Sequence, residues 1–425
     1  MIEKNDFRWW AKKQDADSVM ATYNHIRNRD GSRREDNLRN MRLYGNRDFA
    51  GVGPTGYSIP MSQERVTLNV IKSVCDTVSA RIAKNRPRPV FLTSGGNYSL
   101  RRRAQLLEKF VESQFYTAGL YNIAPKVFLD ACVFGTGVIK TYRVGDKIYM
   151  ERVFPGEVFV DQAEGLYGEP RQMFQRKFIN RDVLIDMFPK KAGQLRSANG
   201  FDDEDGAYGF DSTADQLCVV EAWHLPSGPG AKDGKHCIVV DGVELISEEW
   251  KQESFPFSFI RWGDRLRGFW GMGLAEELTG IQIEINKLLM KIQKAMQLLA
   301  VPWVLVEAGS KIKKAHLNNQ IGAIIPYSGT PPIVRPNQTM SPEVFSHLDR
   351  LYQRAYEIAG VSQLSATSLK PAGLESGIAL REYNDIESER FALISRQYEN
   401  MFMDVAKKVV SLGKEISEEF KNWSV

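Results

Sequence analysis

Long apolar runs are missing from this sequence of 425 residues, and none approaches the roughly eighteen residues that a membrane-spanning helix needs. The N-terminal segment MIEKNDFRWWAKKQDAD carries charges where a secretory signal would carry an apolar stretch, so we expect no secretory route. Cysteine is scarce, with four residues that form neither a CxxC pair nor a zinc-type spacing: Cys75, Cys132, Cys218 and Cys237. These absences predict a soluble, intracellularly made protein whose cysteines are buried small hydrophobes.

The usual signatures of catalysis are also absent. There is no GxxxxGK[ST], no GxGxxG after a strand, no HExxH and no GxSxG, and the five histidines are scattered. The glycine-rich segment 268–273 lacks a following Lys-Ser/Thr, so we interpret it as a turn that lets Phe269 and Trp270 pack. The acids at 202–205 lack the register of a calcium loop. We therefore expect no catalytic residue, no metal site and no cofactor, and this protein is predicted not to be an enzyme.

A strong excess of one charge is lacking too, because the net charge is only +4. The average conceals an asymmetry, since residues 51–110 carry ten Lys and Arg against three acids, whereas residues 201–254 carry three Lys against thirteen acids. The difference indicates one surface that tolerates phosphate and another that rejects it. Two solvated faces that merely differ in charge are an equally good interpretation.

The first half of the chain predicts three helices followed by strands. Apolar residues recur at helical spacing at about 64–85, where Arg86-Pro87-Arg88-Pro89 ends the helix, and further helices are expected at about 100–116 and 122–134. Residues 138–262 alternate polar and apolar side chains, with a hairpin signal at Gly145-Asp146, and predict strands with one helix near 181–187.

The second half is dominated by long helices. Apolar residues at 274, 278, 281, 285, 288, 292, 295 and 299 form a heptad seam on a helix over 273–300. Residues 301–340 predict a small β module, and Ser341-Pro342-Glu343 begins a helix that runs to Gly360. A linker of small residues follows, and a last helix spans about 378–420. This order predicts an α+β protein with an antiparallel helical stalk and a β head at its tip.

The order of elements and four stretches resemble the portal protein, or head–tail connector, of tailed double-stranded DNA bacteriophages, most nearly the podovirus type. The similarity is spread over about residues 40–410. The stretches are NVIKSVCDTVSARIAKNRPRPVF at 69–91, ERVFPGEVFVD at 151–161, FIRWGDRLRGFWGMGLAEELTGIQIEINKLLMKIQKAM at 259–296 and AGVSQLSATSLKPAGLESGIALREYND at 359–385.

The resemblance implies a division of the chain into the parts of a portal subunit. Residues 1–272 would form the N-terminal part of a strand-rich and helical wing. The stem helices, the clip, the tunnel loop and the C-terminal wing helix would follow in the order 273–300 (stem), 301–340 (clip), 341–360 (stem), 361–377 (tunnel loop) and 378–425 (wing helix). We expect the crown to be minimal or absent, or cut from this sequence.

The resemblance also implies a function. Copies of the chain, usually twelve, would form a ring at one capsid vertex of the virion, after assembly in the host cytoplasm and away from membranes. The ring would be the channel for packaging and ejecting double-stranded DNA. Its partners would be the terminase large subunit, the tail adaptor protein, and the major capsid and scaffolding proteins.

Four groups of residues are assigned to these roles. We expect a contact between subunits along the seam, whose apolar faces a lone stalk could not bury, at Ile281, Ile285, Leu288 and Ile292. Channel contacts are assigned to Lys370 in the tunnel loop and to one face of the stem with Lys287, Lys291 and Lys294. Docking of terminase and tail is assigned to the clip residues Lys311, Lys313, Lys314 and Arg335.

Each assignment has an alternative. The stem lysines fit a solvated outer face equally well, and the clip cations fit ordinary loop solvation. For the whole chain, the main alternative is a head–tail adaptor or scaffold that does not thread DNA, which would have no need of the seventeen-residue linker 361–377. A metal-dependent nuclease that uses the acids at 202–215 ranks third.

Overall fold

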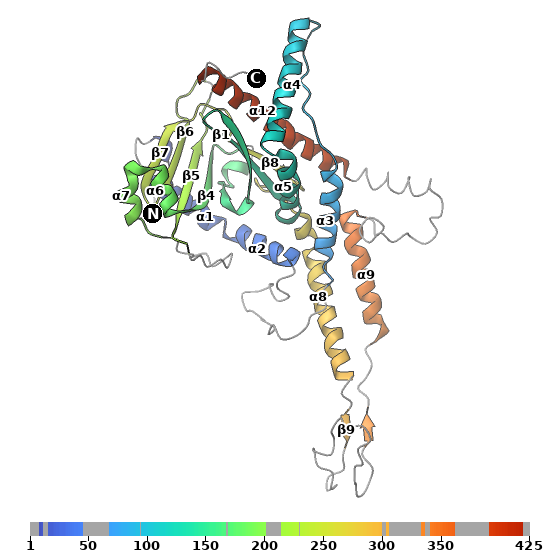
Figure 1. The fold of residues 1–425 in the computed structure, drawn as a ribbon. Coiled ribbons are helices and arrows are strands. Elements are labelled where there is room, and N and C mark those ends of the chain that lie inside the picture. Colours follow the sequence, from blue (N-terminus) through green and yellow to red (C-terminus); the bar gives the residue numbers. More distant parts are fainter. Residues whose placement is uncertain are drawn as a thin grey trace.

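The computed structural model is a mixed α+β protein with a broad body and a narrow stalk (Figure 1). It describes residues 8–11, 16–45, 68–93, 95–166, 169–200, 214–228, 230–299, 303–305, 333–335, 341–361 and 391–419. No helix in these ranges combines the length and the apolar character that crossing a membrane requires.

In the described residues, six helical segments precede the first strand. They are η2 (Trp9–Ala11), α1 (Ala16–Arg29), α2 (Gly31–Gly45), α3 (Val70–Ala83), α4 (Tyr98–Thr117) and α5 (Leu120–Phe134). The three helices that the sequence predicts are confirmed as α3, α4 and α5. Asn69 caps α3, because its side chain accepts a hydrogen bond from the backbone N–H of Lys72. Gly135 ends α5 with a φ of +85°, a left-handed conformation that suits glycine.

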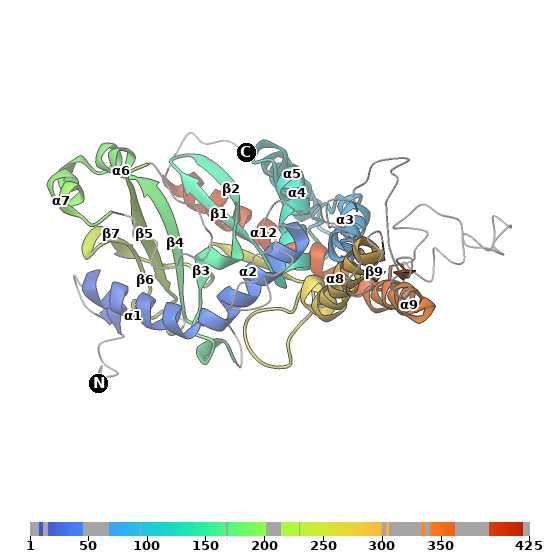
Figure 2. The ribbon, with the colours of Figure 1, turned by 90° about the horizontal axis from the view of Figure 1, so that it is seen from below.

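Two antiparallel sheets form the rest of the body. The smaller has the order β2-β1-β8 and the larger the order β3-β4-β5-β6-β7, which α1 covers on one face (Figure 2). The strands are β1 (Thr136–Val144), β2 (Lys147–Val153), β3 (Val158–Phe159), β4 (Gln172–Asn180), β5 (Gln216–His224), β6 (Lys235–Val240), β7 (Val243–Glu249) and β8 (Phe257–Arg261).

The predicted strand-rich region is thereby confirmed, including the two-residue hairpin at Gly145-Asp146, where Val144 pairs with Lys147. The expected helix near 181–187 is α6 (Arg181–Met187). Helices α1 and α2 were not predicted from the sequence, nor were the short helix α7 (Ala192–Ser197) and the single turns η3 (Pro155–Glu157), η4 (Glu164–Leu166) and η5 (Pro189–Lys191).

The glycine-rich segment 268–273 joins the body to the stalk by close backbone packing. A Cβ atom at Gly271 would lie 2.3 Å from the carbonyl oxygen of Gly135, and one at Gly273 would lie 2.7 Å from the Gly135 nitrogen. Only glycine therefore fits at these crossings. Phe269 and Trp270 are buried, which confirms the interpretation of this segment as a packing turn.

The stalk consists of α8 (Leu274–Leu299) and α9 (Pro342–Ala359), which pack against each other. At the far end, β9 (Trp303–Leu305) and β10 (Ile333–Arg335) pair antiparallel (Figure 1). Helix α9 begins with the predicted cap, since the Ser341 side chain accepts from the backbone N–H of Glu343, and it ends at Gly360 with a φ of +69°. The two predicted helices and two short strands between them are confirmed, whereas the rest of the predicted β module at 301–340 lies outside the described residues.

Helix α12 (Ala392–Glu419) crosses the body and packs on β1, β8 and α4. One apolar cluster joins residues of α3, α5, the upper part of α8, the end of α9 and α12, so the stalk is rooted in the core of the body. Tyr398, Val405 and Ile416 are buried as their periodicity predicts, but Leu393 is largely exposed and does not belong to the buried face. The cysteines are free, and all except the half-buried Cys218 are buried.

Candidate functional site

The heptad seam of α8 is covered within a single chain. Ile285 has no exposed surface, Leu288 and Ile292 are buried, and Ile281 is partly buried, where α8 packs against α2, α3, α5 and α9. This corrects the expectation that a lone stalk could not bury these faces. Their burial requires no second copy, so it carries no argument for a contact between subunits.

Two buried polar residues sit beside this seam and anchor α8 to the body. The Gln282 Oε1 atom accepts hydrogen bonds from the backbone N–H groups of Val70 (2.8 Å) and Ile71 (3.3 Å), the first residues of α3. Its Nε2 atom donates to the Leu68 carbonyl (2.9 Å) and to Asn286 Oδ1 (2.9 Å). Gln282 therefore satisfies N–H groups that a helix N-terminus leaves without an internal partner. This role of Gln282 was not predicted from the sequence. A polar residue beside a long apolar seam is the pattern that could have indicated it.

The three stem lysines behave as one exposed face. Lys287, Lys291 and Lys294 are all exposed, and within the described residues one ion pair involves them, between Lys287 Nζ and Glu284 Oε2 at 3.8 Å. Such an exposed pair contributes little to stability. The described stalk therefore offers a row of solvated cations, as both the channel-facing and the outward-facing interpretations require.

Some apolar side chains of the stalk are left uncovered. Met296 of α8 is 60 % exposed, and Phe345 and Ile358 of α9 are 41 % and 47 % exposed. These side chains lie outside the buried seam, on helices that project from the body (Figure 1). They leave apolar surface exposed on the two stalk helices.

Most of the predicted clip and tunnel-loop residues lie outside the described part of the chain. This holds for Lys311, Lys313, Lys314 and Lys370, and for the linker 361–377 except Val361. Arg335 ends β10, where its backbone pairs with that of Trp303. Val361 is buried, and its N–H donates to the carbonyl of Tyr356.

A cavity lined by many charged side chains lies between the two sheets of the body. This cleft of about 1170 Å³ is lined by residues of both sheets and by the end of α12. Lys140 of β1 reaches across it and donates to Gln175 Oε1 (3.0 Å) and Glu221 Oε2 (2.5 Å) of the larger sheet, and Lys177 pairs in the same way with Glu151. At one side of the cleft, Arg143 pairs with Glu419 of α12 at 2.6 Å.

A histidine completes this network. The ring of His236 lies between two carboxylates, with Nε2 2.9 Å from Glu221 Oε1 and Nδ1 2.8 Å from Glu248 Oε1. Burial alone would lower the pKa of His236, but its hydrogen bonds to the two carboxylates outweigh burial and raise it. Burial would raise the pKa of Glu221, yet Lys140 and His236 lower it to about 2. Each charge is thus held by an opposite one, which makes the network a structural tie between the sheets and not a poised acid or base.

These shifts fix the pH range in which the network stabilises the fold. A raised pKa at His236 contributes stability that is complete below its ordinary value of 6.5 and is lost as the pH rises through the folded-state pKa. A lowered pKa at Glu221 contributes stability that is complete above its ordinary value of 4.5 and is lost as the pH falls toward about 2. Both contributions are therefore largest between these two ordinary values.

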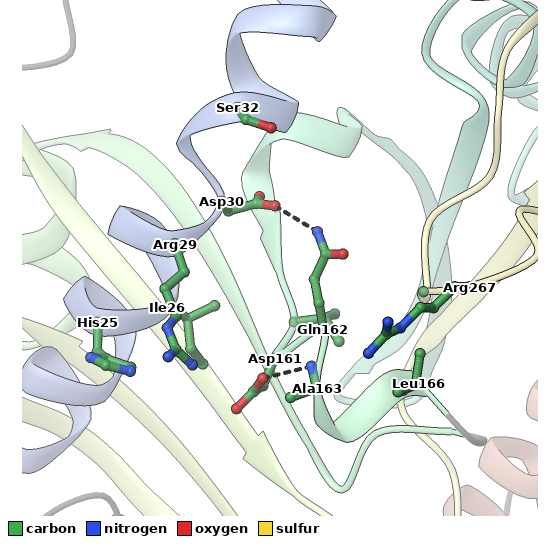
Figure 3. A pocket seen from close by; sticks show the side chains of 12 residues that line it. His25, Ile26, Arg29, Asp30, Ser32, Asp161, Gln162, Ala163, Leu166 and Arg267 are labelled. Atoms are coloured by element: carbon green, nitrogen blue, oxygen red, sulfur yellow. Dashed lines mark hydrogen bonds between the residues drawn. The ribbon is translucent and has the colours of Figure 1, made fainter.

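A second, smaller pocket of about 540 Å³ lies where α1 meets α2 (Figure 3). Its buried carboxylate, Asp30, is bound by Arg33 and accepts from Gln162 Nε2 at 3.2 Å, and Asp161 accepts from the Ala163 N–H at 2.9 Å. These acids hold the turn between the helices and the loop that faces it. The carboxylates are occupied within the chain, so the pocket shows no free acid–base pair.

Metal chemistry finds no support among the described residues. No three His, Cys, Asp or Glu side chains gather there as ligands. Residues 202–213, which supply most of the acids of the nuclease alternative, lie outside the described part, and Asp215 is bound by Arg181 with a distance of 2.7 Å from Nε to Oδ2.

Comparison with known families and with curated proteins gives no match to this chain. The functional assignment therefore depends on the order of the elements and on the geometry of the stalk, the wing and the exposed charges.

Proposed function

We propose that this chain is the subunit of a phage portal, a ring at one vertex of the capsid through which double-stranded DNA is packaged and ejected. The observation that carries the proposal is the stalk: two long antiparallel helices, α8 and α9, project from a mixed α/β body and end in the β9–β10 pair. An elongated projection of this kind exposes more surface than a lone chain needs. It suits a subunit that lies beside copies of itself.

In this proposal the parts keep the roles that the resemblance implies. The body and α12 form the wing, α8 and α9 form the stem, residues 301–340 form the clip and residues 361–377 form the tunnel loop. The clip docks the terminase large subunit and later the tail adaptor, and the wing meets the capsid and scaffolding proteins. The protein acts as a conduit in the virion and not as an enzyme.

In this proposal, the contact between subunits is made by exposed apolar side chains of the stalk and not by the buried seam of α8. Met296, Phe345 and Ile358 are available for contact, whereas Ile285, Leu288 and Ile292 are already covered. A ring that repeats one heterologous contact places such side chains against the next subunit. We assign the contact between stems to these uncovered positions.

The channel needs weak and exchangeable phosphate contacts. Affinity for DNA rises steeply with the number of phosphates that a protein neutralises, so a tight grip would stall a moving duplex. The stem lysines Lys287, Lys291 and Lys294, with Lys370 of the tunnel loop, would offer sparse cations that the duplex touches in turn.

Electron microscopy of the purified full-length chain tests the proposal. We expect rings with a central hole, together with a mass that is a fixed multiple of the subunit mass. Monodisperse monomers or open filaments under all ionic conditions tried would contradict it. If rings assemble into heads and blocking their central channel does not affect DNA packaging, the adaptor alternative is favoured.

A further inference from the structure

Helix α4 projects from the body at the end of the molecule opposite to the β9–β10 pair (Figure 1). Only its second half packs in the core, through Phe110, Val111 and Phe115. Its first six residues, Tyr98–Arg103, are all exposed. We call residues 84–93 and 95–106, which comprise the segment leading to α4 and its first half, the α4 prong.

The prong is cationic throughout. Residues 84–106 contain six Lys and Arg and no acid, and the six cations are all exposed: Lys84, Arg86, Arg88, Arg101, Arg102 and Arg103. Arg88 pairs with Glu112 of the lower half of α4 at 3.3 Å. The other acid of α4, Glu108, accepts a hydrogen bond from the backbone N–H of Phe91. Within the described residues, no ion pair is formed by Arg101, Arg102 or Arg103.

These arginines are placed where they do not help the helix itself. The N-terminal end of a helix carries the positive end of its dipole and favours acids, yet the first turn of α4 contains none and three arginines follow it directly. Three adjacent like charges also repel one another. Neither packing nor helix stability accounts for the cluster, which is exposed and available to an anion outside the chain.

Prolines and hydrogen bonds restrict the backbone of the prong. Pro87 and Pro89 restrict the backbone around Arg86 and Arg88. Tyr121 of α5 donates from its hydroxyl to the Pro87 carbonyl at 3.3 Å, and Asn97 caps α4 by accepting from the Ser99 N–H. The cations therefore lie along two neighbouring segments on an open surface. A surface of this kind fits a long polyanion better than a small anion, which needs an enclosed pocket.

We propose that the α4 prong binds the phosphate backbone of duplex DNA without regard to sequence. This inference rests on the proposed function, because a duplex that runs along the stalk of a portal meets this end of the subunit on the side away from the clip. Arginine guanidinium groups form bidentate hydrogen bonds with phosphate, and a ring of subunits repeats such contacts many times. An acidic protein surface is the competing partner, and the test below separates the two.

The test compares two triple charge reversals in the purified full-length chain. The first, R101E/R102E/R103E, removes three of the six prong cations and places acids near the helix N-terminus, where the helix dipole favours them, so α4 should stay folded. The matched control, K190E/K191E/R196E, makes the same charge change at the α6–α7 end of the body, away from α4 (Figure 2). Thermal melting of both variants checks that the fold is intact.

Binding to a labelled duplex of about 30 base pairs is measured by fluorescence anisotropy over a range of salt concentrations. We expect the prong variant to bind at least tenfold more weakly at low salt, with the slope of log K against log salt reduced by about 2 to 3, because each lost phosphate contact removes about 0.9. The control should stay within about twofold of the unmodified chain. An unchanged affinity and slope in the prong variant, or an equal loss in the control, would overturn the inference.

A second probe, poly-glutamate, addresses the competing partner. Weaker binding of poly-glutamate than of duplex by the unmodified chain supports DNA, whereas tighter binding that depends on Arg101–Arg103 would overturn it in favour of an acidic protein. Failure here is distinguishable from failure of the proposed function. If rings form normally but the prong does not bind DNA, only this inference fails and the portal proposal holds. If the prong binds DNA but the chain forms no ring, the portal proposal fails and the DNA-binding inference holds.

Discussion

Replacing Gln282 with alanine should open the junction between the stalk and the body. The side chain is buried and makes four hydrogen bonds, two accepted from the start of α3 and two donated to Leu68 and Asn286. Alanine leaves at least two buried groups, the Val70 N–H and the Asn286 Oδ1, without a partner. At about 1–2 kcal/mol for each such group, we expect a loss of about 2–4 kcal/mol.

Hydrogen exchange followed by mass spectrometry reads this effect locally. If α3 opens more readily, amide exchange in the peptide covering residues 69–75 should accelerate by roughly 30- to 900-fold, which is the same free energy expressed as an equilibrium constant. A local readout is preferable to a global melt, because a chain of this size need not unfold in one step.

Two further variants sharpen the measurement. Gln297→Ala removes an exposed glutamine on the same helix and should change exchange at α3 by less than about twofold. Gln282→Glu keeps an acceptor for Val70 and Ile71 at the positive end of α3 but loses the two donated bonds, so it should fall between alanine and the unmodified chain. If Gln282→Ala leaves the exchange of this peptide unchanged, Gln282 does not anchor the stalk.

Three more predictions follow from the same structure. Ile285→Asp should lower the free energy of unfolding in urea by about 4 kcal/mol, because it buries a charge in the core of one chain. Met296→Asp lies at an exposed site, so it should leave unfolding unchanged and impair the ring assembly seen by microscopy. Shortening residues 365–372 to two glycines, or Lys370→Glu, should leave rings intact while heads retain less full-length DNA; normal DNA content would make the loop a passive connection. His236→Gln should flatten the pH dependence of the urea midpoint above about pH 6.5, where the unmodified chain loses stability as the pH rises, and an equal decline in both would show that His236 is not the titrating group.

The helices and strands were predictable because their signals are local. The Ser341-Pro342-Glu343 start of α9, the glycine at the end of α5 and the hairpin at Gly145-Asp146 each depend on a few neighbouring residues. The heptad pattern likewise identified the apolar face of α8. It could not identify what covers that face, since an apolar seam looks the same whether the covering helix belongs to the same chain or to another copy.

The charged network between the sheets could not be predicted for a related reason. Lys140, Gln175, Glu221 and His236 are spread over almost a hundred residues, and they meet only through strand pairing in the larger sheet and the packing of the two sheets. Strand alternation predicts which residues share a face, but the register between distant strands decides which carboxylate meets which cation. The acidic excess in residues 201–254 was visible in the sequence, whereas the pairing of Glu221 with His236 and Lys140 was not.

The junction between body and stalk bears directly on whether a closed ring is possible. A ring closes only if every subunit turns through the same angle relative to its neighbour, and a variable angle gives open helical assemblies instead. At this junction, Gly271 and Gly273 pack against Gly135 at distances that exclude any side chain, Gln282 ties α8 to α3, and Arg265 pairs with Glu276 in the first turn of α8. These contacts hold the direction of the stalk relative to the wing from three sides. Loosening them should therefore disturb the closure of the proposed ring before it affects the contacts between subunits.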